Sequence, residues 1–220
     1  PVPFQFFTVE GSRIDEGIMS RFHVVSPAEV RLRRFLKEKP RIGPSLVFTL
    51  LRVSEWAKSI QAGEAENPLR RKLTHSATGS EPIQQIAENL IERASGIERD
   101  LLLKSIQELL FYCVNFETNL NLEQIKTRLK GFLDQEKRFA FMQQFLCFYV
   151  FNYVSFYTSD SFRAMSSTPQ VFEQEMEQVE KICERTVASA LEPYEQAESV
   201  LDRTAAEELI QKIEQRLRGE

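Results

Sequence analysis

The sequence predicts an all-α protein: a bundle of about seven to nine helices that follows a short extended N-terminal arm. Three observations predict this fold class. The 220 residues include only 8 Gly and 9 Pro, the two residues that weaken helices most. Apolar residues recur at intervals of three and four over most of the chain, which is the helical period. Hydrophobic residues make up 42% of the chain and include 17 Phe, which is enough to build a core.

The first two predicted elements are the arm and a capped helix. Residues 2–9 are rich in aromatic side chains and contain Pro3, so we expect an extended segment. Ser26 can then cap the amide of Glu29, and Glu29 can reach back to Ser26. Pro27 stands at the first helical position, where its missing N–H costs nothing.

Gly, Pro and capping residues set the expected boundaries of the other helices. The first helix is expected to end near Lys39, before Pro40. Residues 64–79 are polar and are expected to form a loop. Further helices are expected over residues 44–62, 80–95, 97–116 and 122–133, where Ser80 and Asn121 act as caps and the last helix could continue into residues 137–157. Thr168 and Thr204 are expected to open the last two helices, and Pro193 to end the first of them.

The charge distribution divides the chain into two expected units. Residues 1–167 are expected to form a helical core domain with the N-terminal arm, and residues 168–220 an acidic helical pair that packs on the core or extends from it. Residues 1–79 carry a net charge of +5 (13 Lys and Arg against 8 Asp and Glu), whereas residues 160–220 carry −7 (7 against 14). A heptad-like, coiled-coil-like spacing relates Phe172, Met176, Val179, Cys183 and Ala190.

Residues 139–157 are unusually aromatic, because nine of these 19 positions are Phe or Tyr. A helix of this length could span a membrane, but three side-chain amides would be costly in lipid. At the helical period, Gln144, Asn152 and Ser155 fall on one narrow strip and the rest of the circumference is apolar. We therefore expect a central helix that is buried on nearly all sides, with this polar strip reaching water.

An apolar-ligand site along the same segment is the alternative interpretation. Large rigid rings can leave a slot that smaller neighbours do not fill. The candidate wall of a pocket for an apolar or lipid-like ligand consists of Phe141, Phe145, Phe148 and Tyr149.

A basic cluster on the first predicted helix is the candidate interaction face. It consists of Arg31, Arg33, Arg34 and Lys37. This face fits an acidic partner or a phosphate backbone, although the net charge of −4 argues against nucleic acid as the main partner. The other interpretation is an exposed face that is partly neutralised by Glu29 and by the acidic C-terminal region. A base-reading helix-turn-helix is disfavoured, because the second predicted helix begins with the core residues Leu46, Val47 and Phe48.

The sequence contains none of the motifs for nucleophilic catalysis, phosphate binding or His-based metal sites. The two histidines, His23 and His75, have no partner at helical spacing. We therefore expect no catalytic residues, no cofactor and no metal. Cys113, Cys147 and Cys183 are expected to be buried free thiols, which fits a reducing, cytoplasmic environment.

The leading hypothesis is a non-enzymatic protein-interaction or scaffolding domain. It would belong to a longer protein, since the chain starts at Pro1 rather than at Met. Its partner would be another protein or a second copy of the chain, and a membrane location is not expected. Two alternatives stay open: a binder of an apolar ligand around residues 139–157, and a nucleic-acid-associated regulator that uses the basic face at residues 31–37.

Overall fold

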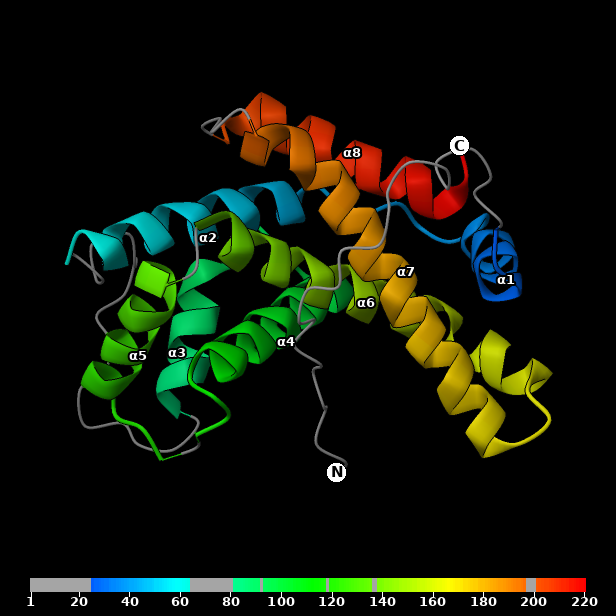
Figure 1. Cartoon of the computed structure of the whole chain (residues 1–220), viewed down its shortest axis with the longest axis horizontal. Coiled ribbons are helices and arrows are strands. Elements are labelled where there is room, and N and C mark those ends of the chain that lie inside the picture. Colours follow the sequence, from blue (N-terminus) through cyan, green and yellow to red (C-terminus); the bar gives the residue numbers. More distant parts are fainter. Residues whose placement is uncertain (1–24, 64–80, 92, 118, 136–137, 197–200) are drawn as a thin grey trace, which may run out of the picture.

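The computed structural model describes residues 25–63, 81–91, 93–117, 119–135, 138–196 and 201–220. Over these ranges the chain folds into eight helices without a strand, which confirms the predicted fold class (Figure 1). The helices are α1 (Pro27–Leu36), α2 (Ser45–Gln61), α3 (Glu81–Leu90), α4 (Gly96–Cys113), α5 (Leu122–Gln135), α6 (Arg138–Met165), α7 (Pro169–Gln196) and α8 (Arg203–Arg218). The predicted arm at residues 2–9 and the predicted cap at Ser80 lie outside the described residues.

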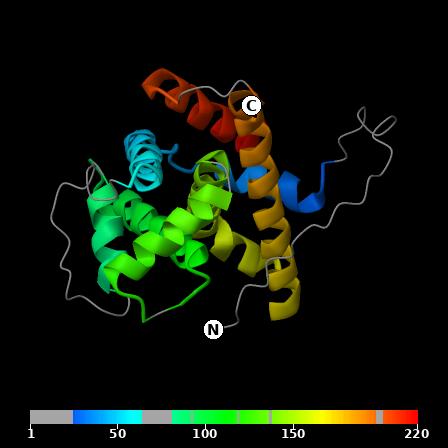
Figure 2. The same cartoon turned by 60° about the vertical axis from the view of Figure 1, so that its left-hand side comes forward.

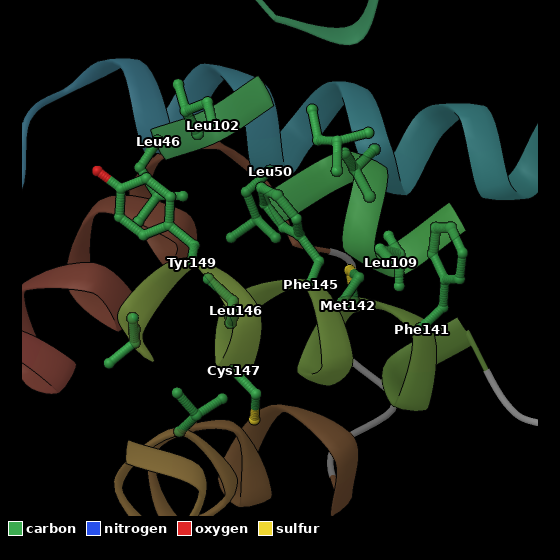
Figure 3. Close-up of a cluster of buried hydrophobic side chains, with 14 of the residues drawn as sticks. Leu46, Leu50, Leu102, Leu109, Phe141, Met142, Phe145, Leu146, Cys147 and Tyr149 are labelled. Atoms are coloured by element: carbon green, nitrogen blue, oxygen red, sulfur yellow. The ribbon is translucent and has the colours of Figure 1, made fainter. Parts of the chain in front are cut away.

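Helix α6 is the central element of the bundle, and it contacts α1, α2, α4 and α7. Three of its aromatic side chains, Phe141, Phe145 and Tyr149, point into the core (Figure 3). Phe141, Phe145 and Tyr149 are each at most 1% exposed, and leucines from α2 and α4 surround them. The prediction of a buried aromatic helix is therefore confirmed. Among the described residues, no helix has the length and apolar character needed to cross a membrane.

The prediction that a polar strip of α6 reaches water was wrong at its central position. Asn152 is only 3% exposed, and its amide donates to Ser105 Oγ at 3.0 Å and to Glu108 Oε2 at 2.6 Å, both on α4. Phe156 is instead one of the exposed residues of α6. Polar partners on a neighbouring helix allow a buried amide, which helical periodicity cannot reveal.

Most predicted helix starts agree with the structure. Ser26 Oγ accepts from the Glu29 amide at 3.2 Å, as expected, but the Glu29 carboxylate pairs with Arg33 rather than reaching back to Ser26. Asn121 and Gln124 form a reciprocal capping box at the start of α5, with both bonds at 2.9 Å. The predicted continuation of α5 into α6 falls on residues 136–137, which lie outside the described residues.

Three predicted boundaries were wrong, each for a local reason. Helix α1 ends at Leu36, before Lys39, because the chain turns towards Pro40. Pro193 lies inside α7 rather than ending it, and in the last turn a proline removes only one intrahelical hydrogen bond. Asp202, not Thr204, caps α8, since its Oδ1 accepts from the Ala205 amide at 2.8 Å.

A buried arginine fixes the C-terminal end of α8 against the link between α1 and α2. The side chain of Arg218 is 5% exposed and pairs with Glu214 at 3.0 Å. Its guanidinium also donates to the carbonyl oxygens of Leu36, Lys39 and Pro40, at 2.5, 3.2 and 2.8 Å. The Leu36 carbonyl belongs to the last turn of α1 and the other two follow it, in a region where backbone acceptors lack i+4 helical donors. Arg218 therefore connects the two ends of the described chain.

The first prediction concerns this buried contact. Replacing Arg218 with Met should lower the free energy of unfolding by about 3–5 kcal/mol, because it leaves Glu214 as an unpaired buried carboxylate. Urea unfolding would measure the loss. The double variant R218M with Glu214→Gln should recover part of it, because the stranded charge is gone. The exposed pair of Arg203 and Glu207 supplies a control, since Arg203→Ala should cost at most about 1 kcal/mol. Equal losses for R218M and R203A would contradict the assignment.

Candidate functional site

The basic face of α1 is divided between paired and unpaired side chains. Arg31 forms an ion pair with Glu175 of α7 at 2.5 Å, and Arg33 forms one with Glu29 at 2.6 Å. Arg34 and Lys37 are exposed and have no ion pair among the described residues. Arg31 and Arg33, two of the four predicted interaction residues, thus form ion pairs within the fold.

Arg33 also brings α1 against the end of α8. Gly219 terminates α8 in the left-handed conformation with φ 73°, and the amides of Gly219 and Glu220 donate to Arg216 and Gln215 carbonyls. A Cβ on Gly219 would lie 2.8 Å from Arg33 Cδ, so the arginine side chain runs directly over this turn.

An open hollow of about 930 Å³ extends along α7 between α1 and α8. Figure 1 and Figure 2 show the same three helices side by side. Charged and small polar side chains form most of its lining, and Gln143 of α6 contributes to one wall. The lining residues used below are Arg33 from α1, Arg185, Ala188, Ser189, Glu192 and Glu195 from α7, and Arg216 from α8. We call this feature the α7 hollow.

Some charged groups of each sign in the α7 hollow have no opposite partner among the described residues. Arg185 donates to the Lys181 carbonyl at 3.3 Å and Arg216 to Ser189 Oγ at 2.5 Å, and neither forms an ion pair within the described ranges. Glu192 accepts from the Gln196 amide, and neither Glu192 nor Glu195 pairs with a described base. The hollow therefore offers two guanidinium groups and two carboxylates to an occupant.

Sequence reasoning singled out Arg33 but missed Arg185 and Arg216. The sequence pattern does indicate the position of Arg185, because Arg185, Ser189 and Glu192 recur at intervals of four and three and so share one face of a helix. That face could be recognised as charged. Its position beside the end of α8 depends on tertiary packing, which no local pattern contains.

The predicted wall of an apolar pocket lies mostly in the filled core. Phe141 and Phe145 are fully buried and Tyr149 is 1% exposed, and all three belong to the single hydrophobic cluster formed by the described core. Phe148 is half-buried, and its ring lies 6.2 Å from that of Tyr112. None of the four lines the α7 hollow. Rings packed on rings are the usual arrangement of a dense interior.

Buried thiols offer little nucleophilic chemistry. All three cysteines are free and buried. Burial raises the pKa of Cys147 to about 12, helped by the charges of Glu184 and Glu180, and burial also raises the pKa of Cys113 and Cys183. A thiol must ionise to attack a substrate or bind a metal, so these three favour a packing role. Within the described ranges, His, Cys, Asp and Glu form no group suited to a metal ion.

Two neighbouring carboxylates, Glu108 on α4 and Glu180 on α7, have raised pKa values. Burial raises the pKa of Glu108, although Asn152 and Lys104 oppose the shift. Burial likewise raises the pKa of Glu180, where Glu184, Glu177 and Glu108 add to the effect. The ionised forms of Glu108 and Glu180 therefore work against the folded state.

Comparisons with known proteins found no matching family model, no matching curated protein and no matching solved structure. The case for function accordingly depends on the geometry of the chain itself.

The second prediction concerns the pH dependence of stability at Glu108. Its pKa is raised on folding, so its contribution favours the fold below the ordinary value near 4.5 and is lost as the pH rises through the folded-state value. Glu108→Gln removes the charge and keeps an oxygen that can accept from Asn152. The variant should therefore gain stability relative to the original chain between pH 4.5 and pH 7.

Urea unfolding at several pH values would measure this gain. Glu55→Gln removes an exposed carboxylate on α2 and serves as the matched control for the change of side chain. A constant difference between E108Q and the original chain across this range would contradict the prediction.

Proposed function

We propose that this chain is a non-enzymatic protein-interaction domain that uses the α7 hollow to bind a protein segment. The observation that carries the proposal is a set of four charges without an ion pair in the described part of the chain, Arg185, Arg216, Glu192 and Glu195, on the walls of an open hollow of about 930 Å³. Unpaired charges of both signs give an interface orientation and partner selectivity.

A protein segment suits this hollow better than a small molecule does. Small-molecule sites usually enclose most of the ligand and are lined mainly by apolar and aromatic side chains. The α7 hollow is open and its walls are charged, whereas the aromatic side chains of α6 are packed in the core. The apolar-ligand alternative therefore has no comparable support.

The nucleic-acid alternative is weaker for an electrostatic reason. A phosphate backbone would need several free basic groups along one surface. Arg31 and Arg33 are already paired with Glu175 and Glu29, and the α7 hollow contains carboxylates that would repel phosphate. A cytoplasmic location is also part of the proposal, supported by the three free cysteines.

The third prediction tests the proposed function by site-specific crosslinking. A photo-crosslinking amino acid at Glu195, an exposed position of the hollow, should form covalent adducts with protein in the native cell. The same amino acid at Gln84, exposed on α3, is the control and should form few adducts. Mass spectrometry would identify the adducts, and Arg185→Ala with Arg216→Ala should reduce them because the hollow loses both unpaired guanidinium groups.

A lack of protein adducts at Glu195, or equal adduct yields at Glu195 and Gln84, would refute the proposed function.

A further inference from the structure

We infer that the occupant of the α7 hollow is a second copy of this chain, docked through antiparallel contact of the two α7 helices. This inference rests on the proposed function, because it names the partner of the same site. It follows from the order of charges along the exposed face of α7.

The exposed face of α7 is basic in its middle and acidic towards its end. Lys181 and Arg185 are exposed, and Glu192 and Glu195 follow about two to three turns later on the lining of the hollow. None of these four has an ion-pair partner in the part of the chain that the structure describes. Exposed Glu173 and Glu177 precede this stretch, but the segment from Lys181 to Glu195 has opposite charges at its two ends and is complementary to itself after rotation about a two-fold axis.

The positions of the charges specify the register of the two helices. A two-fold axis between Ala188 and Ser189 places Arg185 opposite Glu192 of the second copy, and Lys181 beside Glu195 of the second copy. Every such contact occurs twice in the dimer. Ala188 and Ser189 are small side chains at the axis, where Arg216 of α8 donates to Ser189 Oγ, and the separation of packed helices depends on the side chains at their contact.

Competing arrangements bring like charges together. A parallel pair in register would place Arg185 against Arg185 of the second copy. An antiparallel pair centred on Cys183 would place Lys181 against Arg185. Both arrangements are repulsive. An antiparallel pair centred on Val179 would be complementary, with Lys181 against Glu177, but Glu177 does not line the α7 hollow, so occupation of the hollow favours the register given above.

The fourth prediction is a charge-reversal and rescue experiment on the full chain. Sedimentation equilibrium at low ionic strength, from low to high micromolar concentration, should show a monomer–dimer equilibrium. Arg185→Glu and Glu192→Arg should each raise the dimer dissociation constant at least about tenfold, because each introduces two repulsive pairs. The double variant R185E/E192R should restore dimerisation, since it exchanges the charges and keeps their complementarity.

Lys130→Glu makes the same change of charge at an exposed position of α5, outside the hollow, and should leave the dissociation constant unchanged. Circular dichroism and urea unfolding of each variant verify folding. A chain that stays monomeric at all concentrations, or a dimer that R185E leaves unaffected, would overturn the inference. The same holds for a double variant that stays as weak as the single ones.

The outcomes separate this inference from the proposed function. A monomeric chain that still forms adducts with another protein at Glu195 overturns the self-association and leaves the proposed function standing. A chain without any protein adduct at Glu195 contradicts both.

Discussion

Burial of the aromatic face of α6 is the constraint on which the arrangement of the other helices depends. Each buried Phe or Tyr ring removes about 150–250 Å² from water, and Phe141, Phe145 and Phe162 are fully buried. Covering them requires a helix on each side, which α1, α2, α4 and α7 provide. The inner face of α7, with Val179 and Cys183, is committed to this contact. Arg185, Glu192 and Glu195 of α7 therefore lie on its outer face, where they line the α7 hollow.

Local sequence patterns predicted the features that depend on one helix alone. The 3.6-residue period identified which positions face inward, for example Leu102, Ile106 and Val179, because burial of one face repeats with the helix itself. The predicted cap at Asn121 depends on residues three apart and was also correct. Pro193 was misjudged because a proline removes only the hydrogen bond to the carbonyl four residues before it, and the last turn of α7 tolerates that loss.

The remaining features require knowledge of which helices touch. From the sequence, Asn152 is predicted to face water because it is polar. In the structure it is buried, because Ser105 and Glu108 of α4 accept its hydrogen bonds. Arg31 likewise reads as a free cation until Glu175 of α7 lies 2.5 Å away. Helical periodicity reports polarity along one element and contains no information on partners across elements. The candidate site was therefore predicted in part, through Arg33, and its α7 and α8 walls were not.

The end of α8 connects the core to the hollow. Arg218 is buried and bonded to carbonyls at the end of α1 and just after it, whereas Arg216, two residues earlier, is exposed and lines the hollow. Because the buried contact of Arg218 fixes the backbone at this end of α8, folding alone sets the position of Arg216 before any partner binds. A wall that is already in place spares the ordering cost that association otherwise carries. The Arg218 contact therefore has two effects: it stabilises the fold, and it holds Arg216 in position on the wall of the hollow.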